Sequence, residues 1–256
     1  MAAPIVMVHG AFCGGWAFEA FKAPFEAAGH PVLTPDLRGH GLEDRAGAVG
    51  SLSMTDYAKD IATLCEGLEE PPILIGHSLG GLVTQLACRR AKVRALILLA
   101  PSPPWGITGS SMEEAVTAFG LMMGAAWAQS ISPDRTLMRT YSLDRMPRPE
   151  QDAAVARLRP ESGRALWEAL NWWLDPFMTT SVGAGPLGIP CLVMVGQRDV
   201  VHPPMTARQT AQRLGADYRE MPGMSHWLLG ETGWQDVATA AWEWLEPVMA
   251  GETSGA

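Results

Sequence analysis

The chain has 256 residues, of which 47% are hydrophobic and 18% charged, and its net charge is −8. This length and apolar content suit one large α/β domain, with room for an insertion. The acidic balance excludes the basic surface that nucleic acids and anionic membranes require. No uncharged run approaches the ~20 residues of a membrane span, and Met1 to Pro4 leads straight into an apolar run without a signal segment. We therefore expect a cytoplasmic protein, a monomer or a homodimer, with no nucleic-acid or membrane partner.

Short apolar runs alternate along the chain with helical patterns. Most of these runs are continuous rather than alternating, which is typical of parallel strands covered on both faces. They predict an α/β fold, a doubly wound and mostly parallel sheet of about six strands. The expected strands are Ile5–Val8, Val32–Thr34, Ile73–Ile75, Ala95–Leu99, Leu192–Val195 and Tyr218–Met221.

For the helices between these strands, the sequence indicates where a helix begins and which of its faces is apolar. Ser53 with Asp56 three residues later predicts a capping box, followed by an apolar stripe from Tyr57 to Leu68. A helix is expected over about 204–214. The last helix, from Trp234, carries an apolar face that ends at Leu245. We interpret these stripes as core packing.

The region from about Pro103 to Gly188 interrupts the strand–helix rhythm. It is helical in character, rich in Met and Trp, and bounded by Pro and Gly at both ends. We interpret residues 103–188 as an inserted helical cap, residues 1–102 and 189–250 as the core, and 251–256 as a frayed tail. The Met and Trp side chains of the cap are Met112, Met122, Met123, Trp127, Met138, Met146, Trp167, Trp172, Trp173 and Met178.

The segment Gly76-His77-Ser78-Leu79-Gly80 reads G-x-S-x-G between an apolar run and an amphipathic one. A serine on a sharp turn between a strand and a helix has its hydroxyl pushed out of the end of the sheet. It also lies at a helix N-terminus, where free N–H groups favour negative charge. We therefore expect Ser78 to be a nucleophile.

A serine nucleophile needs a base, and the base needs a carboxylate that orients it. In a doubly wound sheet both come from loops at the carboxyl ends of strands. Asp199 follows the run Leu192–Val195 as its strand ends and turns, and His226 follows the weaker sixth run. The intervening residues accommodate one helix and one strand, so we expect Asp199 as the acid and His226 as the base. His202 is the less favoured alternative.

The first strand ends in His9-Gly10-Ala11-Phe12. A backbone N–H just after this turn would face the serine and, with the N–H of Leu79, form an oxyanion hole. We choose Ala11, with Phe12 as the alternative. Phe12 and Trp105 are candidate pocket residues because each follows a strand end.

Two further features receive a structural interpretation. The segment Asp36 to Gly41 comes too early for a catalytic acid, and we expect Asp36 and Arg38 to tie down the loop after the second strand. The four cysteines, Cys13, Cys65, Cys88 and Cys191, form no C-x-x-C pair and are expected to be free and mostly buried. Cys13 lies near the active-site loop, and its accessibility stays open.

With these motifs the chain resembles the α/β-hydrolase family over nearly its whole length, and in particular its compact branch of small esterases, methyl esterases and hydroxynitrile lyases. The resemblance implies a Ser-His-Asp triad, a helical cap and no cofactor or metal. Ser225 departs from the glycine that many members have before the histidine. The matching segments are His9-Gly10 with Trp16, Asp36 to Gly41, Gly76 to Gly81, Gly196 to Asp199 and Gly223 to His226.

The favoured function is a serine hydrolase that cleaves carboxylic esters of small to medium apolar substrates through an acyl-enzyme. Perhydrolysis, lactone hydrolysis and carbon–carbon bond hydrolysis use the same residues and stay open. A hydroxynitrile lyase is disfavoured because the cap has no lysine, the lysines being Lys22, Lys59 and Lys92. Ser78 argues against the members with an aspartate nucleophile, and a non-catalytic ligand receptor is the least favoured reading.

Overall fold

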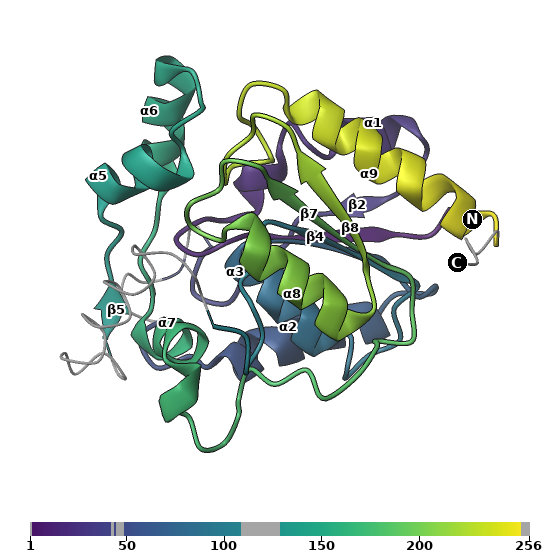
Figure 1. Ribbon diagram of the computed structural model, residues 1–256, viewed down its shortest axis with the longest axis horizontal. Helices are drawn as coiled ribbons and strands as arrows, with labels where there is room; N and C mark the ends of the chain where they lie inside the picture. Colours follow the sequence, from purple (N-terminus) through teal and green to yellow (C-terminus); the bar gives the residue numbers. More distant parts are fainter. Residues whose placement is uncertain (1, 42–43, 45–48, 109–128, 252–256) are drawn as a thin grey trace.

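The computed structural model describes residues 2–41, 44, 49–108 and 129–251. Its centre is a six-stranded sheet with strand order β2-β1-β3-β4-β7-β8 (Figure 1). Every neighbouring pair in this sheet is parallel. The predicted doubly wound α/β fold is confirmed.

The predicted apolar runs form the strands of the sheet. All residues of the central strands β1, β3, β4 and β7 are buried, whereas in the edge strand β8 exposed and half-buried residues alternate up to the buried Met221. Continuous burial explains why the central strands lack alternation in the sequence. The strands are β1 (Ile5–Val8), β2 (Val32–Leu33), β3 (Ile73–His77), β4 (Ala95–Leu99), β7 (Cys191–Gly196) and β8 (Asp217–Met221).

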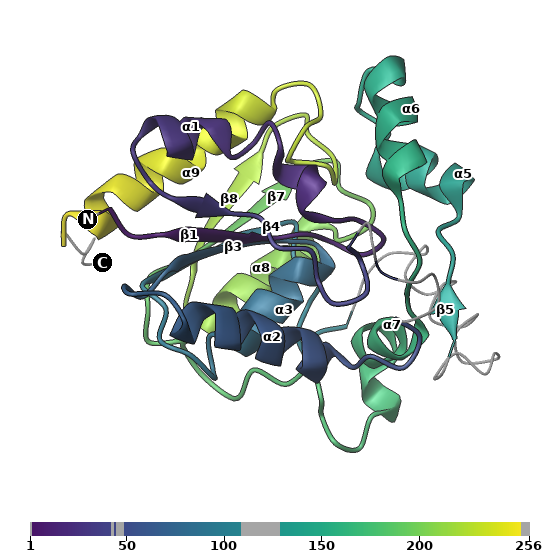
Figure 2. The ribbon, with the colours of Figure 1, turned by 180° about the vertical axis from the view of Figure 1, so that it is seen from behind.

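Helices cover both faces of the sheet (Figure 2). On one face lie α1 (Ala23–Ala27) and α9 (Trp234–Met249), with the short 3₁₀ helix η1 (Gly15–Phe18) packed nearby. On the other face lie α2 (Met54–Glu66), α3 (Leu79–Ala87) and α8 (Pro204–Leu214). Alternate strand residues point to the two sides, so Ile5 belongs to the apolar cluster on the α9 side and Val6 to the cluster on the α2 side.

The predicted helix start at Ser53 is confirmed. The Ser53 hydroxyl accepts a hydrogen bond from Thr55 N–H, and the Asp56 carboxylate accepts one from the Ser53 N–H, which makes a capping box. The predicted helix over 204–214 coincides with α8.

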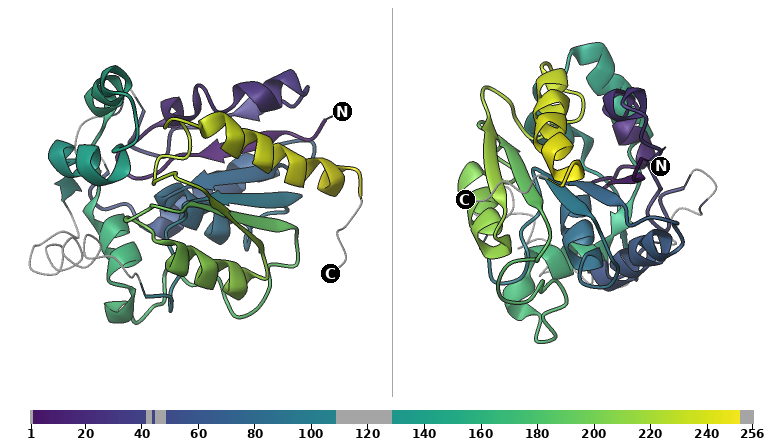
Figure 3. Two further views of the ribbon diagram at one scale, coloured as in Figure 1. Left: turned by 45° about the horizontal axis from the view of Figure 1, so that its top comes forward. Right: turned by 90° about the vertical axis from the view of Figure 1, so that its right-hand side faces the viewer.

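The segment between β4 and β7 leaves the sheet and lies beyond the carboxyl ends of the strands, opposite the start of β1 (Figure 3). Its described part contains α5 (Arg135–Leu137), the π-helical turn η3 (Met138–Ser142), α6 (Arg148–Arg157), α7 (Gly163–Leu170) and the 3₁₀ helix η4 (Trp172–Leu174). It also holds two short antiparallel strands that we did not predict, β5 (Ser130–Ile131) and β6 (Glu161–Ser162). Two residues are too few to show a sequence period.

Part of the expected cap and tail falls outside the described residues. This applies to 109–128, which include Met112, Met122, Met123 and Trp127, and to 252–256 of the tail. The described part of the cap therefore consists of residues 103–108 and 129–188.

Candidate active site

Ser78 occupies the turn that joins β3 to α3, and its backbone has φ 51° and ψ −122°. A positive φ is strained for a residue with a side chain, and it is the conformation of a nucleophile on a sharp strand–helix turn. The turn requires glycine close by, because a Cβ on Gly80 would lie 2.2 Å from the Val8 carbonyl oxygen. Glycine at position 80 therefore allows α3 to begin in direct contact with the end of β1, immediately after Ser78.

Ser78, His226 and Asp199 form a hydrogen-bonded chain across three segments. The Ser78 Oγ lies 3.1 Å from Nε2 of His226, and Nδ1 of His226 lies 2.9 Å from Oδ2 of Asp199. His226 and Asp199 are each only 3% exposed, whereas Ser78 is half-buried. The structure thus brings together the three residues that the sequence analysis selected, within hydrogen-bond distance of one another and in the expected order.

Neighbouring groups hold Asp199 and His226 in position. Oδ1 of Asp199 accepts hydrogen bonds from Val201 N–H at 2.8 Å and His202 N–H at 2.9 Å, which leaves Oδ2 for His226. The His226 carbonyl accepts from Nε2–H of His77 at 3.0 Å. Burial lowers the pKa of His77 well below its ordinary value, so its ring stays neutral.

The expected oxyanion donors lie beside Ser78. Ala11 and Leu79 both line the cavity that contains Ser78. Leu79 is the first residue of α3, and the first N–H groups of a helix have no partner within it. The alternative donor, Phe12 N–H, points instead to the Glu161 carboxylate at 3.4 Å. The structure therefore favours Ala11 over Phe12.

A cavity of about 400 Å³ opens over Ser78. Its floor consists of loops at the carboxyl ends of the strands, including Gly10 to Cys13 and His77 to Leu79. The described part of the cap supplies its wall, which is mostly apolar but carries a few polar side chains. The lining cap residues are Ile131, Ser132, Asp134, Leu137, Met138, Tyr141, Ser142, Leu166, Ala169 and Leu170.

The two expected pocket residues differ in their placement. Phe12 lines the cavity, whereas Trp105 is not among the described residues that do so. The Trp105 ring packs instead against Trp172 of the cap, with ring centroids 5.1 Å apart. A residue that directly follows a strand lies at the carboxyl edge of the sheet, but the turn there determines where its side chain points. The pocket assignment of Trp105 therefore needs correction.

The four cysteines are free, and three of them are buried, as expected. Cys13 lines the cavity yet is buried, and burial raises the pKa of its thiol. The Asp36–Gly41 segment also behaves as expected, because Asp36 accepts from Gly15 N–H and Arg38 pairs with Asp60.

The sequence analysis did not single out several residues around the site, and it considered His202 only as an alternative base. Oγ of Ser102 and Nε2 of His202 lie 2.9 Å apart, and both residues line the cavity next to His226. Behind His226, the buried Glu231 carboxylate accepts a hydrogen bond from Ser225 N–H. Glu161 of the cap is also buried and contacts the core. The signal of Ser102, Glu161 and Glu231 in the sequence is weak, because a single Ser or Glu is usually exposed to solvent.

The described residues contain no group of three or more His, Cys, Asp or Glu side chains that is arranged to hold a metal ion. Within the same residues, no helix is both long and apolar enough to cross a membrane.

Comparison with known proteins finds relatives that match part of this chain. Two relatives are salicylic acid-binding protein 2 of Nicotiana tabacum, 39% identical over 111 residues, and the carbendazim hydrolyzing esterase of Nocardioides sp. strain SG-4G, 41% identical over 101 residues. These alignments cover 41% and 38% of the chain. They span only 42% and 41% of the relatives' own lengths.

The solved structures match over a greater length. A monoacylglycerol lipase of Paleococcus ferrophilus superimposes with a TM-score of 0.71 at 24% identity, over 98% of this chain and 96% of that one. A thermophilic esterase of Thermogutta terrifontis gives a TM-score of 0.71 at 22% identity, over 97% of this chain and 91% of that one. At such identities the likeness shows the fold. The sequence model described as the alpha/beta hydrolase family matches residues 5–241, and the chain belongs to that family.

Proposed function

We propose that this protein is a serine hydrolase that cleaves carboxylic esters, with Ser78 as nucleophile, His226 as base and Asp199 as the orienting acid. The observation that carries the proposal is the continuous chain of hydrogen bonds from Ser78 through His226 to Asp199, at 3.1 and 2.9 Å. The names of relatives support it, because they include the carbendazim hydrolyzing esterase and a pyrethroid hydrolase of Sphingobium wenxiniae.

The residues suggest a two-step reaction. Ser78 Oγ attacks the ester carbonyl while His226 Nε2 takes its proton, and His226 then returns that proton to the leaving alkoxide. The acyl-enzyme is hydrolysed by a water that His226 activates in the same way. Asp199 keeps the proton on Nδ1 and stabilises the imidazolium. The N–H groups of Ala11 and Leu79 stabilise the oxyanion, each by about 3 kcal/mol in the transition state.

The cavity indicates an uncharged and mostly apolar substrate. Apolar side chains such as Phe12, Leu137 and Leu166 line it, and Asp134 adds a negative charge to the cap wall. Arg139, which would be a candidate partner for an anionic substrate, is engaged with Gln151 and Asp152. Esters of small to medium apolar acids and alcohols are therefore the proposed substrates.

The test compares wild type with Ser78→Ala on p-nitrophenyl esters. Turnover should disappear in the variant while its circular dichroism and melting temperature stay close to those of wild type, because the hydroxyl contributes chemistry and little packing. A fluorophosphonate should label Ser78 in wild type, located by mass spectrometry. Ser102→Ala removes a neighbouring cavity hydroxyl and serves as control, since it should retain both turnover and labelling. Near-normal turnover by Ser78→Ala would refute the assignment.

A further inference from the structure

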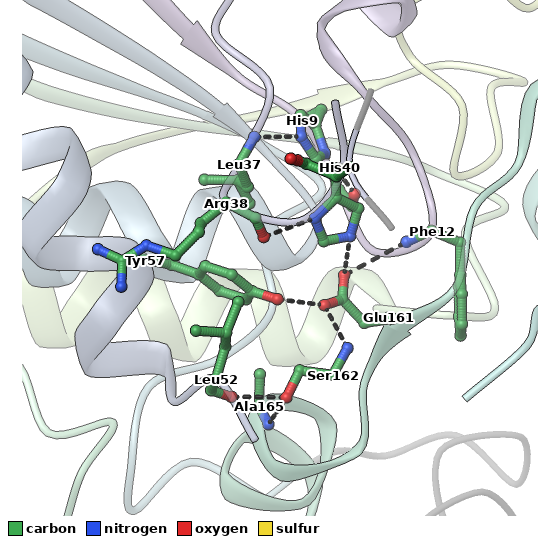
Figure 4. Close-up of polar contacts among 12 residues, drawn as sticks. His9, Phe12, Leu37, Arg38, His40, Leu52, Tyr57, Glu161, Ser162 and Ala165 are labelled. Atoms are coloured by element: carbon green, nitrogen blue, oxygen red, sulfur yellow. Dashed lines mark hydrogen bonds and ion pairs between the residues drawn. The ribbon is translucent and has the colours of Figure 1, made fainter. Parts of the chain in front are cut away.

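The carboxylate of Glu161, on β6 of the cap, is surrounded by groups from several segments (Figure 4). The side chain is fully buried, at 0% exposure. Oε1 accepts hydrogen bonds from Tyr57 O–H and Ser162 N–H, both at 2.7 Å. Oε2 accepts from His40 Nε2–H at 3.1 Å and from Phe12 N–H at 3.4 Å. One cap residue thus contacts α2, the loop after β2 and the loop after β1.

The buried carboxylate is charged and paired. Burial by itself raises the pKa of Glu161, but the charge of His40 and the hydrogen bonds from His40, Tyr57 and Ser162 N–H outweigh it, and the pKa lies below its ordinary value. For His40, burial by itself lowers the pKa, but the negative charge of Glu161 outweighs burial, and the pKa of His40 lies above its ordinary value. A buried ion pair is costly to break, so the carboxylate keeps a defined position.

Phe12, one of the groups that Glu161 contacts, has a strained backbone. Its φ is 65°, which is unusual for a bulky residue and costs about 1–3 kcal/mol. Such strain persists only where the surroundings hold it. The cap holds Phe12 on both sides, because Glu161 faces its N–H and the Arg159 N–H donates to its carbonyl at 2.8 Å.

The loop that Phe12 belongs to also carries the proposed oxyanion donor. The carbonyl of Gly10 accepts a hydrogen bond from His9 Nδ1–H at 2.9 Å. In a trans peptide the N–H points opposite to the C=O, so the Ala11 N–H is directed away from His9. A Cβ on Gly10 would lie 3.0 Å from Cβ of Ser78, so the loop packs directly against the nucleophile. His9 holds the loop before Ala11, and Glu161 holds it after.

On these contacts we propose that Glu161 is a positioning residue, which from the cap fixes the Phe12 peptide and thereby aims the Ala11 N–H at the oxyanion on Ser78. The inference rests on the proposed ester hydrolysis. In this proposal the cap not only lines the cavity but also positions one of the oxyanion donors. A shift of the cap strand would move an oxyanion donor, and about 1 Å of misplacement at a reacting centre costs on the order of 100-fold in rate.

The test is Glu161→Gln. The amide oxygen can still accept from Tyr57 and Ser162 N–H, but its NH₂ then replaces the acceptor that faces Phe12 N–H. We expect kcat for p-nitrophenyl acetate to fall roughly 10- to 100-fold, with KM changed less than about threefold. The affinity for a trifluoromethyl ketone, whose Ser78 adduct carries an oxyanion, should fall by the same factor.

Glu168→Gln is the matched control. Glu168 is another buried carboxylate of the described cap, 1% exposed, and it ties α7 to α2 through hydrogen bonds from Ser53 Oγ–H at 2.8 Å and Met54 N–H at 2.9 Å. Among the described residues its hydrogen bonds and ion pair go to Ser53, Met54 and Arg164, none of which belongs to the loop after β1. If Glu161 acts by positioning that loop, Glu168→Gln should keep its kcat and its ketone affinity within about twofold of wild type, even where its melting temperature falls.

The outcomes separate the two proposals. A wild type that neither hydrolyses esters nor is labelled at Ser78 would overturn the proposed function, and this inference with it. An active wild type together with unchanged kcat in Glu161→Gln, or with equal losses in both Gln variants, would overturn the positioning role alone. If Glu161→Gln does not fold, Glu161→Asp keeps the charge but withdraws it from Phe12 N–H. The same loss of kcat and ketone affinity is expected of it, and wild-type values would overturn the inference.

Discussion

The two carboxylate oxygens of Asp199 have different partners. Oδ1 accepts the N–H groups of Val201 and His202 and so closes the turn after β7, while Oδ2 faces Nδ1 of His226. One residue thus shapes its own loop and orients the proposed base. This division makes the effect of an isosteric substitution predictable.

In Asp199→Asn the amide oxygen should keep the turn, which places the NH₂ group toward His226. The imidazole then has to present an unprotonated Nδ1 and carry its proton on Nε2, so it no longer accepts the Ser78 proton. We expect kcat to fall by about 10⁴-fold with little change in melting temperature. Asp175→Asn, at a buried turn aspartate of the cap, is the control and should retain activity. Equal activity in both variants would contradict the role of Asp199.

Glu231 sits behind the proposed base, where Oε1 accepts from Ser225 N–H at 2.8 Å. Oε2 is buried with no hydrogen-bond partner among the described residues. Burial raises the pKa of this carboxyl from 4.5 to about 7. The folded state therefore favours the protonated form, and this contribution to stability is full below the unfolded pKa and is lost as the pH rises through about 7.

Glu231→Gln removes this ionisation, because the amide stays neutral at every pH. The free energy of unfolding of the variant relative to wild type should rise between pH 4.5 and pH 8, by about 3 kcal/mol for the stated shift. Urea unfolding at pH 4.5, 6 and 8 measures it. A difference between variant and wild type that does not change with pH would contradict the burial of a titrating carboxyl at this position.

At the scale of elements, the start of α3 against the end of β1 is what exposes Ser78. α3 approaches β1 so closely that a Cβ on Gly80 would meet the carbonyl oxygens of Val8 and His9 at 2.2 and 2.3 Å. These atoms are backbone and cannot rotate away. The turn at Ser78 thus depends on helix–strand packing as much as on its own conformation.

Gly80→Ala should therefore destabilise the fold by about 3 kcal/mol or more and reduce ester turnover, since α3 has to move away from β1. Gly67→Ala is the matched control, at the C-terminal end of α2. Its φ is −79° and a Cβ would meet Leu64 O at an ordinary 3.5 Å, so stability should stay within about 0.5 kcal/mol of wild type or rise slightly. Chemical denaturation measures both, and similar values for the two variants would contradict the close approach.

At the scale of the whole molecule, the core and the cap each build part of the cavity. Loops at the carboxyl ends of the strands supply the proposed catalytic groups, and the described cap supplies most of the apolar wall. The Glu161 and Glu168 carboxylates join the two parts at separate points. Substrate selection should accordingly depend on the cap, whereas the proposed reacting groups belong to the core and the cap affects them through Glu161.

A series of p-nitrophenyl esters from acetate upward tests the apolar wall. Burial of each added methylene contributes about 0.8 kcal/mol to binding in the transition state. We therefore expect kcat/KM to rise about three- to fourfold per methylene until the cavity of about 400 Å³ is filled. An acyl chain that ends in a carboxylate should be a poor substrate because its charge would be desolvated near Asp134. A flat series, or preference for the charged ester, would show that the cap does not provide this wall.

Local features of the sequence determined much of the fold. The apolar run Ile73–Ile75 predicted a buried strand, and Ser53 with Asp56 predicted a helix start, because strand burial and helix capping depend on residues a few positions apart. The turn at Ser78 was readable for the same reason. The order of strand ends then predicted that Asp199 and His226 lie near it, as the structure has them.

The tertiary structure alone decided what depends on contacts between distant segments. The direction of Trp105 followed from its packing on Trp172, not from its position after β4. Glu161 meets Tyr57, His40 and Phe12 across 104, 121 and 149 residues, and none of these separations has a period that a sequence displays. A buried carboxylate looks like a solvated one until its donors are brought to it, because desolvation and pairing arise only when the cap packs on the core.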